Sequence, residues 1–289
     1  MTKKKKSYID MYNHHLNEIQ KIDKNVNVIF DTTEDEVDWL RKNRKQKREE
    51  KKNKKYEKAE TIKILDKILN AKNNISQLYN DKIVNRSGMT VDTKEYYTEV
   101  ISGRLLEEIK GLKDSIVPID RKKGYRVDSH RKVISKTDTN RDEENMAKNL
   151  LWTNIDYLGR IIDFQVPLKD KDSDNAGKID LISFKDGESP ISYIVELKIE
   201  NNNETLLRAA LEIFTYYCQL NKENFIKSFE EYKHLEPKDI KKAVLLEEGS
   251  LAHNEYCEKK LRNRPKLKTL IKELDIDIFS FKLNVEKLC

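Results

Sequence analysis

The sequence contains few of the residues that build turns, flexible linkers and disulfide frameworks. Among its 289 residues there are 8 glycines, 5 prolines and 3 cysteines. So little glycine and proline excludes collagen-like, linker-like and turn-rich all-β architectures. No pair of glycines has the spacing of a dinucleotide-binding fingerprint. Cys218, Cys257 and Cys289 share no metal-ligand spacing, so we expect reduced thiols in an intracellular protein.

Long apolar runs are also missing. The longest uninterrupted run of apolar residues covers only residues 243–246, whereas a helix that spans a bilayer needs about 20 such residues. The four lysines at positions 3–6 are followed by no apolar stretch, which is unlike a secretory signal. We therefore expect a cytoplasmic protein without a membrane partner.

Charged residues, by contrast, are abundant and unevenly distributed. They make up 37% of the chain, well above the average of about 25%. The net charge of +6 combines +10 over residues 1–140 with −4 over residues 141–289. Residues 41–58 hold eleven basic and three acidic side chains, which fits either a solvated helix face or a polybasic arm. The asymmetry suggests a nucleic-acid or other polyanion partner for the first half.

The first half is predicted to be mostly helical. Thr33 and Glu36 have capping-box spacing at the start of one helix, and Thr93 is a candidate cap for another, which Pro118 would end. We predict that residues 1–125 form a helical, basic region that holds nucleic acid, a partner or a second subunit in a homodimer. The polar, basic residues 119–140 are predicted to be a solvated connector, with a phosphate-contacting linker as the alternative.

The pattern after residue 140 predicts alternating helices and strands, which form a second domain over residues 126–289. The expected order is α-β-β-β-α-β-α-β, an α+β or α/β fold with a mixed β-sheet flanked by helices. Asp186-Gly187 marks a turn between two of the strands. The expected helices cover 142–158, 204–220 and 256–274, and the expected strands cover 161–168, 178–184, 192–199, 243–246 and 276–283.

Charged residues inside two of these apolar strands are the strongest functional signal. Residues two apart on a strand share a face, so Glu196 and Lys198 point the same way. If the strand of Asp180 pairs with theirs, two carboxylates and one ammonium converge. Carboxylate oxygens suit a hard cation such as Mg²⁺, and a bound cation can activate water against a phosphodiester. The alternative is an exposed Glu–Lys pair on an edge strand.

Acid-x-Lys triplets are not rare in the chain. Glu108 and Lys110 belong to one of them, and Asp239 and Lys241 belong to another. Neither lies in an apolar, β-rich segment with an acidic residue on a preceding strand. This context favours the triplet at Glu196 as a functional site, because charges in an apolar strand are costly unless they are paired or bound to metal.

Residues 142–220 resemble the PD-(D/E)xK nuclease superfamily, which has the restriction-endonuclease-like fold. Asp180 matches the first acid of the motif, and Glu196-Leu197-Lys198 matches the second acid, the spacer and the lysine. Ile179 stands where the motif's name has proline, a frequent variation in the superfamily.

Further features of the resemblance lie on the flanking helices. A glutamate on the helix before the first strand is common, and Glu143 or Glu144 would match it, with Glu143 favoured by its spacing to the apolar face. Glu212 and Tyr216 resemble a Gln-x-x-x-Tyr variant, with glutamate in place of glutamine. Arg208 either contacts a phosphate or pairs with an acidic residue on its own helix.

The resemblance implies a nuclease that uses Mg²⁺, with Mn²⁺ as a substitute, and that cleaves DNA rather than RNA in defence, restriction or repair. Asp180 and Glu196 would bind the metal, and Lys198 would orient the attacking water. The alternatives are a nucleic-acid-binding module of the same fold without catalysis, or a helical interaction protein. The further candidates for substrate contact are Arg208, Glu212, Tyr216, Arg121, Lys122, Lys123 and Arg126.

Overall fold

The computed structural model describes residues 55–71, 75–131, 142–171, 176–257 and 261–282. The chain divides into two compact units, Met1–Tyr56 and Glu57–Cys289. The helix start expected at Thr33 and most of the basic segment 41–58 lie outside the described residues. Within the described ranges, no helix is long and apolar enough to cross a membrane.

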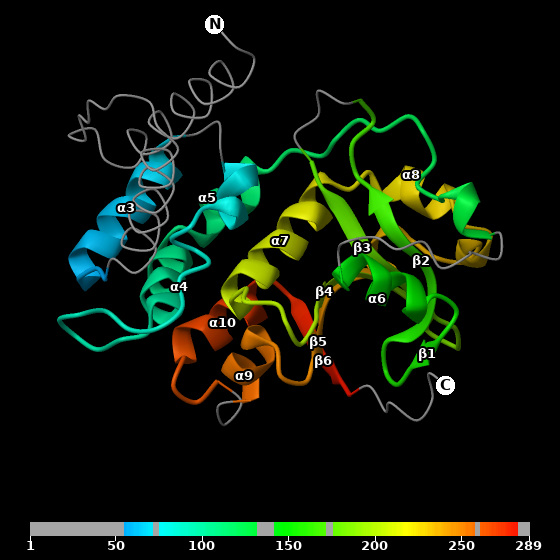
Figure 1. The fold of residues 1–289 in the computed structure, drawn as a ribbon. Coiled ribbons are helices and arrows are strands. Elements are labelled where there is room, and N and C mark those ends of the chain that lie inside the picture. The colour runs from blue at the N-terminus through cyan, green and yellow to red at the C-terminus, as the bar shows by residue number, and fades with distance from the viewer. Residues whose placement is uncertain (1–54, 72–74, 132–141, 172–175, 258–260, 283–289) are drawn as a thin grey trace, which may run out of the picture. The chain divides into compact units, whose positions relative to one another are not determined.

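A mixed sheet forms the centre of the second unit (Figure 1). In the described part of the chain it has six strands, which lie side by side in sequence order. Neighbouring strands from β1 to β4 are antiparallel, whereas β4, β5 and β6 are parallel. The strands are β1 Asn154–Ile155, β2 Gly159–Pro167, β3 Lys178–Lys185, β4 Ile191–Lys198, β5 Ile240–Glu247 and β6 Ile276–Phe281.

Two helices cover the two faces of this sheet. Val195 and Leu197 on β4 pack in one apolar cluster with Ala147 of α6 (Asp142–Leu150). Because side chains alternate along a strand, Glu196 and Lys198 face the other side, toward α7 (Leu206–Gln219). The fold is therefore mixed α+β with helices on both faces of the sheet, as the sequence predicts.

The remaining helices pack around this core. A first group precedes α6: α3 Lys58–Asn70, η1 Ile75–Asn80, α4 Tyr97–Glu107, α5 Ile109–Ser115 and η2 Asp128–Arg131. A second group follows α7: α8 Lys222–Lys227, η3 Glu230–Tyr232, η4 Pro237–Asp239, α9 Leu251–Cys257 and α10 Pro265–Glu273.

The early helices are attached directly to the later part of the chain. The Thr205 amide donates to the Asn85 side chain over 2.8 Å. The Glu99 carboxylate accepts from the amides of Lys266 and Leu267 at the start of α10, where a negative charge complements the helix dipole. Helices α3 to α5 therefore belong to the same compact unit as the sheet, and the boundary between the units lies at Tyr56.

The described part of the expected connector 119–140 differs from the prediction. Arg121 is only 7% exposed and Tyr125 is fully buried. The Ile119 amide donates to Gln219 at the end of α7, and the Tyr125 amide donates to Ser228. The segment is thus packed on the domain and is not a solvated connector, because its polar backbone groups find partners there.

Three expected helices have other bounds. The helix expected over 142–158 ends at Leu150, because Trp152 adopts a left-handed backbone (φ +67°) and its amide donates to Ile161 across a hairpin. The helix expected over 256–274 is interrupted before Pro265, which begins α10 and has no amide hydrogen to continue an earlier helix. The helix expected from Thr93 begins instead at Tyr97.

Candidate active site

The strands of Asp180 and Glu196 are neighbours. Leu181 on β3 lies opposite Val195 on β4, and continuing this antiparallel register places Asp180 opposite Glu196. One carboxylate oxygen of Asp180 accepts the Leu197 amide over 2.9 Å, and the other accepts the side-chain amide of Gln165 over 2.9 Å. Both oxygens of Asp180 are therefore held in a fixed orientation.

Glu196 and Lys198 share the inner face of β4, as alternation predicts. Their side chains form an ion pair of 2.6 Å, and the two residues are only 3% and 2% exposed. Burial raises the pKa of Glu196 well above its ordinary value, and the nearby carboxylates of Asp180 and Glu212 add to the effect. This pair is buried, so the alternative of an exposed edge-strand pair is wrong.

Lys198 stands at the centre of a group of carboxylates. Its Nζ lies 2.5 Å from Glu204, 3.8 Å from Glu212 and 3.9 Å from Glu143, besides the contact with Glu196. Burial alone would lower the pKa of this ammonium, but the surrounding carboxylates outweigh it and hold the pKa well above its ordinary value. Lys198 is therefore a fixed positive charge.

The pKa of Asp180 is raised from 3.8 to about 7, chiefly by burial. The ammonium of Lys198 and the Leu197 amide oppose this shift, whereas the carboxylates of Glu143 and Glu212 add to it. A carboxylic acid with a pKa near neutrality is typical of active sites, where burial and neighbouring charges shift pKa values.

Both candidate glutamates of α6 lie at the pocket, and the contacts of Glu143 connect it to Lys198. The Glu143 carboxylate accepts from the Asn202 side chain over 2.8 Å and lies 3.9 Å from Lys198. Burial raises the pKa of Glu143, and the carboxylates of Glu204 and Glu212 contribute. Glu144 lines the same pocket. Glu143 of α6 belongs to the group of carboxylates around Lys198.

Helix α7 brings three of the predicted residues to the site. Arg208 Nε lies 2.9 Å from Glu204 and 3.9 Å from Glu212, so the pairing interpretation of this arginine applies. Tyr216 donates its hydroxyl to Glu212 over 2.9 Å and packs edge-on against the ring of Tyr79. Burial, reinforced by the Glu212 carboxylate, raises the pKa of Tyr216.

The predicted basic contacts of residues 121–126 divide into two kinds. Arg121 donates to the carbonyls of Lys169 and Gly124, and Arg126 forms a two-pronged ion pair with Glu231 at 2.6 and 3.1 Å. These guanidinium groups have structural partners. Lys122 and Lys123 are exposed.

Two residues at the site were missed by sequence reasoning. Gln165 adopts a left-handed backbone (φ +45°) inside β2 and donates to Asp180; nothing in its sequence context indicates either feature. The sequence predicts Glu204 at the start of a helix, but the residue precedes α7 and its carboxylate contacts Lys198. Its position only six residues after Lys198 is the one sequence feature that indicates this contact.

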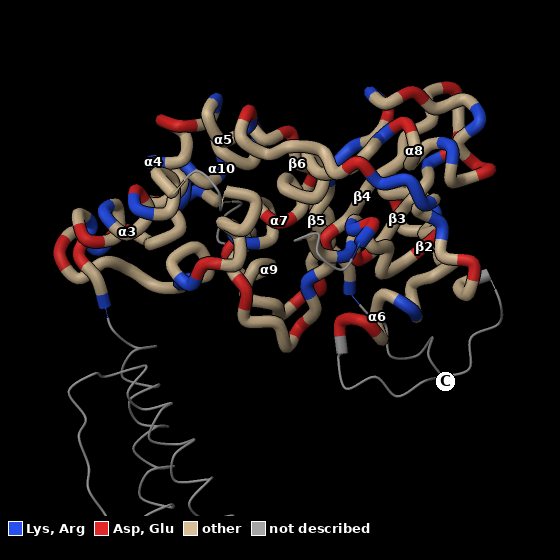
Figure 2. The backbone as a smooth tube through the Cα atoms, turned by 90° about the horizontal axis from the view of Figure 1, so that it is seen from above, with Lys and Arg blue, Asp and Glu red and all other residues tan. Residues whose placement is uncertain are grey.

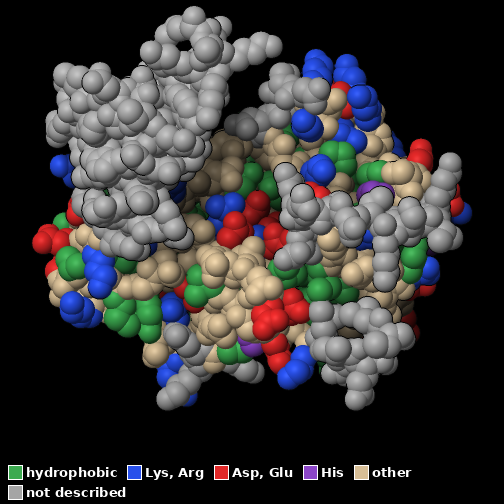
Figure 3. All heavy atoms as spheres, in the orientation of Figure 1, with side chains coloured by type: hydrophobic (Ala, Val, Ile, Leu, Met, Phe, Trp, Pro, Cys, Tyr) green, Lys and Arg blue, Asp and Glu red, His purple; other side chains and the backbone are tan. Residues whose placement is uncertain are grey.

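These side chains line one pocket of about 390 Å³. It lies among β2, β3, β4, α6 and α7, and its wall includes Asp180, Glu196, Lys198 and Glu204. Figure 3 shows acidic and basic side chains meeting in a hollow near the middle of that face. Lys169 and Lys178, on either side of the β2–β3 turn, also line the pocket.

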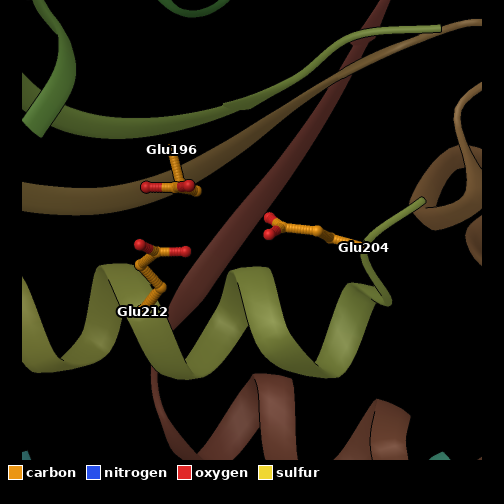
Figure 4. A group of neighbouring side chains, drawn as sticks. All are labelled: Glu196, Glu204 and Glu212. Atoms are coloured by element: carbon orange, nitrogen blue, oxygen red, sulfur yellow. The ribbon is translucent and has the colours of Figure 1, made fainter. Parts of the chain in front are cut away.

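The chemistry of the donor set fits a divalent cation. Carboxylate oxygens of Glu196, Glu204 and Glu212 lie within 4.8 Å of one another, and Figure 4 shows the three side chains pointing toward a common space from β4, the loop before α7 and α7 itself. The Glu212 Oε2 atom is buried and accepts no hydrogen bond. Hard cations prefer such oxygens. Asp180, the predicted ligand on β3, lines the same pocket.

Comparison with known proteins found no match. No family model matches this sequence, and no curated protein and no solved structure matches the chain.

Proposed function

We propose that this protein is a metal-dependent nuclease of the PD-(D/E)xK type that hydrolyses phosphodiester bonds, with DNA as its substrate. One observation carries the proposal: Asp180, Glu196 and Lys198 converge on a single pocket from two paired strands. The motif resemblance of residues 142–220 supports the same conclusion. By analogy with that superfamily, defence, restriction or repair is the expected setting.

Asp180 and Glu196 are the proposed ligands of Mg²⁺, for which Mn²⁺ would substitute. A cation bound there would polarise the phosphodiester and lower the pKa of the attacking water. The chain itself supplies orientation, because Gln165 and the Leu197 amide hold both oxygens of Asp180. Glu204, Glu212 and Glu143 set the charge of the pocket around them.

Lys198 is proposed to position the attacking water and to offset charge that develops on the phosphoryl oxygens. Its raised pKa keeps the ammonium protonated at neutral pH, so it acts as a donor and a positive charge and not as a base. Its contacts with Glu196 and Glu204 fix Nζ at the floor of the pocket.

The test is cleavage of supercoiled plasmid and of single- and double-stranded oligonucleotides with Mg²⁺, Mn²⁺ or a chelator. Glu196→Ala and Lys198→Ala should each lower the rate at least about a hundredfold, the usual effect of losing a preorganised electrostatic group. The chain offers a matched control in another acid-x-Lys triplet, because Glu108→Ala and Lys110→Ala alter exposed side chains.

Three outcomes are informative. Metal-dependent cleavage that only the site variants lose supports the nuclease. Cleavage that survives both site variants contradicts the assignment of Glu196 and Lys198. Nucleic-acid binding without cleavage favours a binding module of the same fold, for which the closed ion-pair network among Lys198, Glu196 and Glu204 would be structural.

A further inference from the structure

Two segments far apart in the sequence lie side by side next to the pocket. The Lys123 amide donates to the Asp170 carboxylate over 3.1 Å, and Arg121 donates to the Lys169 carbonyl. Asn224 of α8 also holds the segment of Arg121 and Lys123 in place. Its side-chain amide donates to the carbonyls of these two residues over 2.7 and 2.9 Å. The alignment of the two segments is therefore built into the fold.

This alignment gathers five lysines, which we call the lysine strip. Four of them are exposed and Lys169 is half-buried. Two of the bonds between the segments are made by Arg121 and by Asp170 to backbone groups. Figure 2 shows basic stretches of the chain close together beside β2, β3 and α8. The strip consists of Lys122, Lys123, Lys169, Lys171 and Lys178.

The lysine strip is continuous with the candidate active site. Lys178 begins β3 two residues before Asp180, and Pro167 pairs with it across the β2–β3 hairpin. Lys169 and Lys178 line the same 390 Å³ pocket as Asp180 and Glu196. A nucleic-acid strand bound along the lysine strip would therefore pass next to the pocket.

We propose that the lysine strip is the surface that holds the phosphate backbone of the nucleic-acid substrate and leads it to the pocket. This inference rests on the proposed nuclease function. The pocket presents at least five acidic side chains, which repel a polyanion, so a substrate needs positive charge beside it. The ammonium groups of the lysine strip supply that charge, and their contacts with phosphates do not depend on the base sequence.

The composition of the strip favours a phosphate backbone over an acidic protein. Protein interfaces are typically centred on aromatic or other large apolar anchors with little lysine. No aromatic residue belongs to the strip, and Tyr125, the nearest aromatic in its first segment, is fully buried. Five ammonium groups therefore suit the repeated phosphates of a nucleic acid better than the surface of a folded protein.

The experiment measures binding apart from cleavage. Full-length protein in chelator is titrated against a fluorescent 20-base-pair DNA duplex at several salt concentrations. Because residues 41–58 also carry eleven basic side chains, binding alone is not diagnostic, and the slope of log K against log salt is the measure. Each lost phosphate contact should reduce that slope by about 0.9.

The variants are matched in charge. Changing all five strip lysines to glutamine should weaken binding at least tenfold at moderate salt and reduce the slope by about 2 to 4. The control changes five exposed lysines elsewhere to glutamine and should reproduce the wild-type slope; these are Lys63, Lys67, Lys110, Lys268 and Lys272. Circular dichroism and thermal melting check that both variants are folded.

The result that overturns the inference is an equal change of slope in the two variants, or none in either. Failure of the proposed function has a different signature. If the wild type never cleaves but only the strip variant loses affinity, the strip stands as a nucleic-acid surface and the nuclease proposal falls. If cleavage is metal-dependent while the strip variant binds like the control, the strip is wrong and the nuclease stands.

Discussion

At the residue scale, the site brings together several carboxylates whose negative charges repel one another. Asp180, Glu196, Glu204, Glu212 and Glu143 share a pocket with one buried ammonium. In water their mutual repulsion would be weak, but burial strengthens it and raises the pKa of Asp180 and Glu196. The fold therefore carries a local instability at this place.

That instability predicts a pH dependence. The folded-state pKa of Asp180 is about 7 against an ordinary 3.8, so between these values the folded protein holds a proton that the unfolded chain releases. The free energy of unfolding in chelator should therefore fall as pH rises from about 4 to 7. Asp180→Asn removes this term, and thermal melting should show it more stable than the wild type at pH 8.

Asp180→Asn can keep both hydrogen bonds. The new side-chain oxygen can accept from the Leu197 amide, and the new side-chain N–H can donate to the Gln165 oxygen once the Gln165 amide has rotated. At pH 4.5 the advantage should disappear. Asp186→Asn, in an exposed turn, is the control and should show no such difference between the two pH values. A constant gain across pH would mean that charge is not its cause.

Gln165 leads to a second prediction at this scale. Left-handed backbone is unfavourable for residues with a side chain and concentrates at functional sites, and here it points the Gln165 amide at Asp180. Gln165→Gly should accommodate the backbone while removing the amide. We expect cleavage to fall about tenfold or more as Asp180 loses its fixed orientation, with a melting temperature no lower than that of Gln165→Ala. Wild-type cleavage by the glycine variant would exclude a positioning role.

At the scale of elements, α7 connects the site to the N-terminal helices. It carries Arg208, Glu212 and Tyr216 on one face, and its N-cap is Thr205. The Thr205 hydroxyl oxygen accepts the Arg208 amide over 3.2 Å and donates to the Val84 carbonyl over 3.0 Å. One buried hydroxyl thus fixes both the start of α7 and its attachment to residues that precede the sheet.

Thr205→Ala should therefore lower the free energy of unfolding by about 1–2 kcal/mol, the upper range for a lost cap, because the Val84 carbonyl also loses its partner. Thr205→Ser keeps both bonds and should recover most of the loss. Urea denaturation measures both variants. Thr269→Ala removes an exposed hydroxyl on α10 and serves as the near-neutral control; an equal loss there would contradict the capping argument.

At the scale of the whole molecule, the helices before the sheet belong to the same compact unit as the sheet. Leu65, Ile101 and Leu105 of α3 and α4 are fully buried, and residues from Glu57 onward form one compact unit with the sheet. A fragment of residues 57–289 should therefore fold cooperatively. A fragment of residues 126–289 should expose the apolar surfaces of α7 and α10 and aggregate or melt without a sharp transition.

Circular dichroism melting and limited proteolysis distinguish the two fragments. Restoring residues 57–125 as a separate chain to the shorter fragment is a useful control, because added helices should recover the transition if packing alone is missing. A cooperative transition in the 126–289 fragment by itself would show that the sheet has a sufficient core of its own.

Much of the site could be predicted from the sequence because strand alternation is a local property. It placed Glu196 and Lys198 on one face and Val195 and Leu197 on the other, and the structure has that arrangement. The Asp186-Gly187 turn likewise indicated that β3 and β4 are neighbours, and they pair antiparallel. Apolar patterning also predicted the mixed sheet with flanking helices.

What only the tertiary structure decided concerns groups brought together across the chain. The packing of α6, α7 and β2 decides the contact of Glu143 with Asn202, the pairing of Arg208, the contact of Glu204 with Lys198 and the position of Gln165 beside Asp180. The burial of Arg121 beside Lys169, which separates structural arginines from the lysine strip, likewise depends on packing. Sequence spacing specifies which side chains share an element's face, but distances between elements follow from packing of the whole core.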